Sequence, residues 1–211
     1  MSEDVTKPTR PVIKTIVITG GPCSGKTTAI EWIDKVLRTR GYHMIFIPEV
    51  ATELITGGVA PWTCTSYDEF QRSVIEMQLS KEKAFINAAK RMDQDEIVII
   101  LDRGANDNQG YMTPEGWQAT LKEYGTTREE LYARYDAVFH LVTAGKGARE
   151  AYTLENNKAR AETPEQAASV DDRLIEAWSS HPRFRVIGNT VVFADKLNNL
   201  LNEIIAFLEG E

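Results

Sequence analysis

Short runs of apolar residues alternate along the chain with longer stretches in which apolar residues recur at the spacing of a helix. The short runs predict five strands, at residues 12–19, 43–47, 97–101, 137–142 and 184–187. The longer stretches predict helices at residues 26–40, 67–91, 114–124, 127–134, 164–180 and 194–208. The run at 97–101 is apolar at every position, which is typical of a strand that is covered on both faces.

This alternation of strands and helices predicts the fold class. Strands that are separated by helices form right-handed βαβ crossovers, and these crossovers build a parallel sheet with helices on both faces. We therefore expect an α/β protein with a five-stranded parallel sheet. Ligands in such sheets bind beyond the carboxyl ends of the strands, so residues at strand ends are the first candidates for a functional site.

The chain has 211 residues, a length that favours a single domain with a sizeable core. Residues 1–11 contain two prolines and mixed charges, and we interpret them as a flexible N-terminal lead-in. Residues 12–211 are then predicted to form one domain. We find no internal repeat and no low-complexity segment.

The net charge and the cysteine content limit which partners and which cellular location the sequence predicts. The formal net charge of −7 argues against a nucleic-acid or membrane-surface partner, since both favour a basic face. The two cysteines, Cys23 and Cys64, are too few for a disulfide framework, and no run approaches 18 apolar residues. These features predict a reduced, cytoplasmic location. They leave the oligomeric state open, with a homodimer among the alternatives.

The segment between the first predicted strand and its helix matches the pattern G-x-x-x-x-G-K-[ST] in full. Glycines let the backbone curl so that its N–H groups point at phosphate oxygens, and the positive end of the following helix adds to the attraction. A lysine in this pattern reaches the β- and γ-phosphates, and the hydroxyl that follows it ligates Mg²⁺. We therefore predict a site for ATP or GTP with Mg²⁺, formed by Gly20, Gly21, Pro22, Cys23, Ser24, Gly25, Lys26, Thr27 and Thr28.

An acidic residue and an arginine directly follow the third predicted strand. Asp102 at that position is suited to hold Mg²⁺ through water, together with the Thr27 hydroxyl. Arg103 beside it is a candidate for binding a phosphate or an acceptor group. The alternative is a strand-end ion pair without a ligand.

Glu49 follows the second predicted strand. If the second and third strands are neighbours, Glu49 faces the same crevice as Asp102, where a carboxylate can orient an attacking hydroxyl or accept its proton. The alternative is a glutamate that only interacts with a helix N-terminus. The loop that contains Trp62 follows, and it either lines an acceptor pocket or is a surface loop with one buried tryptophan.

Residues 146–162 carry four cationic side chains, Lys146, Arg149, Lys158 and Arg160, among few large apolar residues. Phosphoryl-transfer enzymes close a cationic lid over the γ-phosphate, where it excludes water and stabilises charge. We predict such a lid here, with Arg160 as the first candidate for the charged contact. The alternative is a solvated loop.

These motifs resemble the NadR-like AAA family of P-loop proteins, which includes the ribosylnicotinamide kinase domain and GTP-binding trafficking proteins. The resemblance rests on the loop 20–28, on Pro48-Glu49-Val50-Ala51 and on Asp102-Arg103-Gly104. Later stretches at 135–141, 155–162 and 177–182 are also similar, and the likeness covers about residues 13–198. It implies a three-layer P-loop NTPase fold with strand order 2-3-1-4-5 and a lid. It also implies that Glu49 acts on an acceptor hydroxyl beside the Asp102–Arg103 pair, and that Arg160 is a lid arginine.

Two functions fit the residues and the resemblance. The first is a kinase that transfers the γ-phosphate of ATP to a hydroxyl of a small metabolite such as a nucleoside. Lys26, Glu49, Asp102, Arg103 and Arg160 are then its catalytic residues. The alternative is a switch or regulator that binds GTP or ATP, hydrolyses it slowly and signals to a protein partner. The chain has no N/TKxD motif for reading guanine, which favours ATP.

Overall fold

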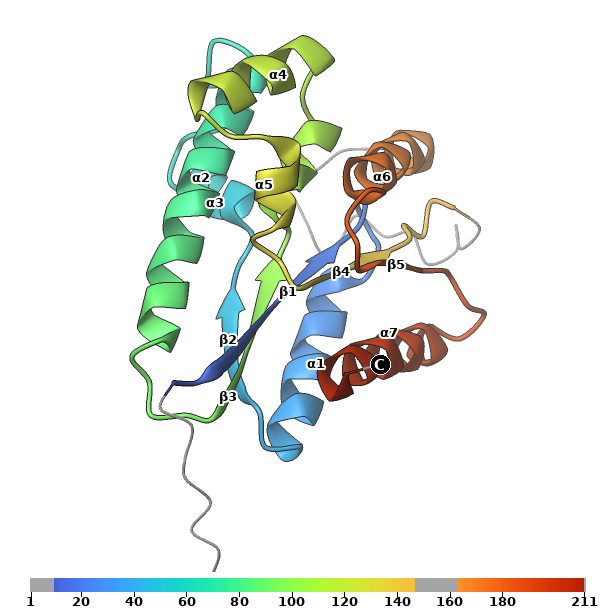
Figure 1. Ribbon diagram of the computed structural model, residues 1–211. Helices are drawn as coiled ribbons and strands as arrows, with labels where there is room; N and C mark the ends of the chain where they lie inside the picture. The colour runs from blue at the N-terminus through green and yellow to red at the C-terminus, as the bar shows by residue number, and fades with distance from the viewer. Residues whose placement is uncertain (1–9, 147–162, 211) are drawn as a thin grey trace, which may run out of the picture.

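The computed structural model describes residues 10–146 and 163–210, and its centre is one parallel sheet (Figure 1). The five strands lie in the order β2-β3-β1-β4-β5, and every neighbouring pair is parallel. The predicted α/β class and the strand order implied by the resemblance are both confirmed. The strands are β1 (Val12–Thr19), β2 (His43–Ile47), β3 (Glu96–Asp102), β4 (Ala137–Leu141) and β5 (Phe184–Ile187).

Helices cover both faces of this sheet (Figure 1). On one face lie α1 (Lys26–Thr39) and α7 (Phe193–Glu209), whose apolar residues form one core cluster with the strands. On the other face a second cluster draws residues from α3 (Tyr67–Ala89), α4 (Pro114–Glu123), α5 (Arg128–Tyr132) and α6 (Pro164–Trp178). None of the helices in the described part of the chain has the length and apolarity that crossing a membrane requires.

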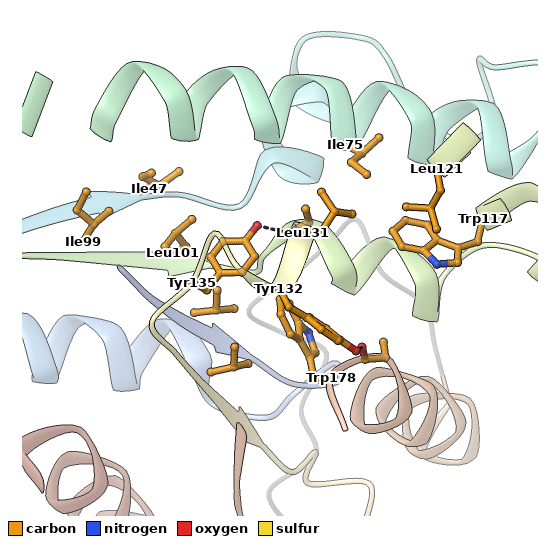
Figure 2. Packing of buried hydrophobic residues seen from close by; sticks show 14 of the residues in the cluster. Ile47, Ile75, Ile99, Leu101, Trp117, Leu121, Leu131, Tyr132, Tyr135 and Trp178 are labelled. Carbon is orange, nitrogen blue, oxygen red and sulfur yellow. Dashed lines mark hydrogen bonds between the residues drawn. The ribbon is translucent and has the colours of Figure 1, made fainter. Parts of the chain in front are cut away.

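The central strands are apolar at successive positions because they contribute to both cores. In β3, Ile97, Ile99 and Leu101 belong to one cluster, whereas Val98 and Ile100 belong to the other. All five side chains are at most 2% exposed, and burying each contributes about 1.5–3 kcal/mol. Figure 2 shows Ile99 and Leu101 in the cluster that also contains Tyr135 and Trp178, with Leu101 beside Tyr135.

Helix starts follow from capping residues that the sequence displays. The side chain of Ser66 accepts the N–H of Glu69 at the start of α3, and that of Thr113 accepts the N–H of Gly116 at the start of α4. Thr163 and Gln166 form a capping box at the start of α6. The predicted ends of all helices and strands agree with the structure within two residues.

Two short elements were not predicted from the sequence, α2 (Val50–Thr56) and the 3₁₀ helix η1 (Ala105–Gly110). Both are too short to display a clear helical period. Polar contacts set the conformation of η1. The Asp107 carboxylate accepts the N–H of Gly104, the Asn108 side chain donates to the carbonyl of Ala105, and the N–H of Ala105 donates to the distant Tyr135 hydroxyl. Most of the predicted lead-in and lid, including Arg160, lies outside the described residues.

Candidate functional site

The predicted phosphate loop connects β1 to α1 at the carboxyl edge of the sheet, and its glycines are sterically required. Gly20 has φ +146°, and a Cβ there would lie 2.2 Å from the carbonyl oxygen of Leu141. Gly25 has φ +86°, and a Cβ there would lie 2.6 Å from the ring of Phe193. The loop therefore has a fixed path between β4 on one side and the start of α7 on the other.

The carbonyl groups of the loop bind donors on its outer side. Pro22 O accepts the hydroxyl of Thr143, Cys23 O accepts the N–H of Ala144 at 3.2 Å, and Ser24 O accepts the ammonium of Lys196 at 3.0 Å. In a trans peptide group the N–H points away from the C=O. Holding these carbonyls outward therefore turns the N–H groups of the peptides toward the concave side, where phosphate oxygens would bind.

A buried carboxylate supports the beginning of the loop. Asp171, on α6, is fully buried and accepts the N–H of Gly21 at 3.0 Å and that of Thr143 at 3.1 Å. It also contacts His140 at 3.0 Å and Lys146 at 2.9 Å. Burial alone would raise the pKa of Asp171, but these partners outweigh burial and lower its pKa to about 2. Asp171 is therefore ionised at neutral pH and anchors the loop to α6.

Lys26, Thr27 and Thr28 form the first turn of α1, directly after the loop. The Lys26 ammonium donates to Gly20 O at 3.2 Å, across the mouth of the loop. Both threonines are exposed at the positive end of a 14-residue helix. The structure thus places the nine residues of the predicted site as one continuous cradle suited to a polyphosphate.

Asp102 ends β3 and lies opposite Ile18 in the register of β1, next to the loop. Its Oδ1 atom is buried and has no hydrogen-bond partner among the described residues. Burial raises the pKa of Asp102, the charge of Lys26 opposes this effect, and the charge of Glu49 adds to it. A buried carboxylate oxygen without a donor fits a cation, so Asp102 and Thr27 are the residues that would hold Mg²⁺ here.

Arg103 connects the ends of three strands. It has φ +74°, which is uncommon for a residue other than glycine, and its side chain is buried. Its Nε atom donates to Glu49 at 2.7 Å, and its Nη1 atom donates to Gly20 O at 3.2 Å and lies 3.4 Å from Asp107. Burial alone would lower the pKa of Arg103, but Tyr111 and these acidic partners raise it well above the usual value. A strand-end ion pair is therefore present, and Arg103 joins the loop to Glu49.

Glu49 lies at the end of β2, which pairs with β3 as the prediction required. It occupies the N-cap position of α2 but makes no side-chain cap bond. Its carboxylate instead binds Arg103 and accepts the hydroxyl of Thr52 at 2.6 Å. Glu49 therefore faces the crevice beside the loop, and interaction with the helix N-terminus alone does not describe it.

A pocket opens beside Glu49 and Arg103, between α2, α3 and η1. Trp62 is 70% exposed at its rim, so the alternative of a buried tryptophan in this loop is wrong. The walls are mainly apolar and aromatic, with a few amide and charged groups. The lining residues are Glu49, Val50, Ala51, Ile55, Pro61, Trp62, Tyr67, Phe70, Gln71, Val74, Gln78, Arg103, Gly104, Asp107, Asn108 and Tyr111.

Several residues of the site were missed by sequence reasoning. Asp107, which accepts the Thr19 hydroxyl and contacts Arg103, lies in a run of polar residues after β3 that was a usable signal. Asp171 and Lys196 lie on amphipathic helices about 145 and 170 residues beyond the loop, and no local pattern marks them. Lys146, the one predicted lid residue that the structure describes, binds Asp171 and Asp172.

The sheet order and the loop define the class of this protein as a P-loop NTPase. A protein-family model described as an AAA domain matches residues 15–192. The chain belongs to this AAA domain family, which implies nucleotide binding and usually Mg²⁺. Comparison with curated proteins gave no match.

Proposed function

We propose that this protein is a cytoplasmic kinase of the NadR-like group, which transfers the γ-phosphate of ATP to a hydroxyl of a small metabolite such as a nucleoside. One observation carries the proposal: the Glu49–Arg103 pair lies between the phosphate loop and an aromatic pocket. Arg103 contacts Gly20 O on one side, and both residues line the pocket on the other. A phosphate donor and an acceptor held in these two places would be neighbours.

The position of each residue in the site indicates the role that it would have in phosphoryl transfer. The loop and Lys26 would bind the β- and γ-phosphates, and the pocket would hold the acceptor with its hydroxyl toward Glu49. When bound between Thr27 and Asp102, Mg²⁺ would supply charge neutralisation for the phosphates. Arg103 would add positive charge near the transferring group. Arg160 remains our proposal for a further cation, in the segment outside the described residues.

We expect Glu49 to act on the acceptor and not on the nucleotide. Its carboxylate lines the pocket while one oxygen accepts the Arg103 N–H, so the ion pair fixes its orientation. A carboxylate held in this way can align an acceptor hydroxyl and take its proton as the new phosphate ester forms. The nucleotide cradle does not include Glu49.

The proposal is tested by a thermal-shift screen with Mg–ATP and Mg–GTP, followed by a coupled kinase assay over nucleosides and related hydroxyl compounds. We expect transfer to at least one hydroxyl acceptor. Other compounds that bind the pocket should inhibit this transfer, because they compete with that acceptor. The kinase assignment fails if the nucleotide binds but slow hydrolysis is the only reaction. If, in addition, a protein partner recognises the triphosphate form, the protein is a switch.

Glu49→Gln separates the two halves of the site. We expect the affinity for Mg–ATP to stay within about twofold while kcat for transfer falls about 100-fold, because the amide cannot accept the proton. Fluorescent-nucleotide titration and the coupled assay measure the two quantities. Glu53→Gln is the matched control, since Glu53 is an exposed glutamate of the same helix that pairs with Lys81. Normal transfer by the Glu49 variant would remove Glu49 from the mechanism.

A further inference from the structure

Lys196 is a buried lysine behind the phosphate loop. It belongs to the first turn of α7, and only 3% of the residue is exposed. Within the part of the chain that the structure describes, its ammonium has three oxygen partners. The ammonium donates to Val142 O at 2.6 Å, to Asn189 Oδ1 at 2.9 Å and to Ser24 O at 3.0 Å. These partners come from the ends of β4 and β5 and from the loop itself. Lys196 therefore connects the loop to the two strands on one side of it.

All three oxygen partners of this ammonium are neutral. Among the charges on the packed elements, Asp171 acts on this ammonium, and Asp171 is itself in contact with Lys146 at 2.9 Å and with His140 at 3.0 Å. Asp195 lies exposed on the same helix. The loop also contributes Lys26 and the thiol of Cys23. Among the described residues, no carboxylate contacts this ammonium. A desolvated, charged amine without such a contact is costly to bury, so we expect it to have a function.

We propose that Lys196 is a positioning residue of the nucleotide site. Its ammonium holds the Ser24 carbonyl on the outer side of the loop, so that the next N–H faces the polyphosphate. It also places a positive charge directly behind the loop, where charge is screened less than at the surface. This role concerns nucleotide binding alone, so it holds for a kinase and for a switch alike.

The burial of this amine gives the proposal a distinctive pH signature. Burial lowers the pKa of Lys196 to about 8, with the charge of Asp171 acting in the opposite direction. Between pH 8 and the usual lysine pKa of about 10.4, the unfolded chain binds more protons at this position than the folded chain. The contribution of Lys196 to stability therefore rises with pH in this window. Nucleotide affinity should fall in the same window, because the positive charge behind the loop is lost.

The experiment measures the Kd of Mg–ATP by calorimetry from pH 7 to 9.5, together with the denaturant midpoint. For the unmodified chain we expect affinity to fall about tenfold across this range, the size of one charge-assisted hydrogen bond. Lys196→Met should bind about tenfold more weakly at pH 7 and show little further decline. The matched control is Lys35→Met, which removes an exposed lysine of α1 and should follow the unmodified chain.

A second variant keeps the test decisive if Lys196→Met does not fold. Asn189→Asp places a carboxylate against the ammonium, so the pH at which affinity is half lost should move upward. The proposal is overturned if affinity is constant from pH 7 to 9.5, if Lys196→Met shows the full decline, or if Asn189→Asp leaves the midpoint unchanged. Failure of the kinase assignment is seen separately, as nucleotide binding without transfer to any acceptor.

Discussion

At the scale of single residues, the site depends on backbone positions where only glycine fits and on charged side chains that are buried from solvent. Gly20 combines a positive φ with a carbonyl oxygen 2.2 Å from the place of a Cβ. Arg103 adopts a positive φ although it has a side chain, and its ion pair with Glu49 and its bond to Gly20 O oppose the backbone strain. The strain thus lies where the phosphate loop, β2 and β3 meet.

Gly20→Ala is predicted to damage both stability and binding. The methyl group would meet the Leu141 carbonyl, so we expect a loss of about 3 kcal/mol in the free energy of unfolding and a large loss of nucleotide affinity. Gly41→Ala is the control, because Gly41 has φ +94° but a Cβ there meets nothing within 4 Å. It should cost only about 1 kcal/mol, from the backbone conformation alone. Equal costs for the two variants in urea unfolding would show that the close approach to Leu141 is unimportant.

At the scale of elements, α6 and α7 connect the far end of the sequence to the phosphate loop. Asp171 of α6 accepts a loop N–H, whereas Lys196 of α7 donates to a loop carbonyl. The loop is thus supported by a buried anion at its start and a buried cation near its end. Because these supports come from different helices, a shift of either helix would change the shape of the loop.

Asp171→Asn tests the first of these supports through its pH dependence. A carboxyl with a pKa of about 2 in the folded state and about 3.9 when unfolded adds about 2 kcal/mol of stability above pH 4. This stability is lost as the pH falls from 4 toward 2. We therefore expect the difference in urea stability between the unmodified chain and the variant to be large at pH 7 and much smaller at pH 2.5.

The neighbouring Asp172→Asn is the matched control for this prediction, since Asp172 is 72% exposed and binds only the Lys146 ammonium of this network. It should change stability little at either pH. A difference between the Asp171 variant and the unmodified chain that does not depend on pH would contradict the assignment of the lowered pKa.

At the scale of the whole molecule, the strand order assembles the site. β1 lies at the centre of the sheet, with β3 on one side and β4 on the other. The end of β3 supplies Asp102 and Arg103, and the chain after β4 supplies Thr143 and Ala144 to the outer side of the loop. The loop therefore lies where connections leave the sheet in opposite directions, which is where ligands bind in open α/β sheets.

The parts of this arrangement that are local in sequence were predictable. Buried strands, capped helices and the nine-residue loop each display a pattern within a short window, and strand ends pointed to Asp102 and Glu49. Contacts between distant segments were not predictable, because the pairing of Asp171 with Gly21 or of Lys196 with Ser24 depends on how whole helices pack. A strand-end ion pair of Arg103 was an alternative from the sequence, but Glu49 was not predicted as its partner, because this contact joins the ends of two different strands.

The central claim is that the turn between β1 and α1 binds a nucleoside triphosphate with Mg²⁺, and calorimetry of the full chain with Mg–ATP and Mg–GTP tests it most directly. We predict saturable binding of at least one of them at micromolar concentration, weakened at least 100-fold by Lys26→Ala, with Lys35→Met unchanged. No detectable binding of either nucleotide by the folded protein, or equal binding by the Lys26 variant, would contradict the account.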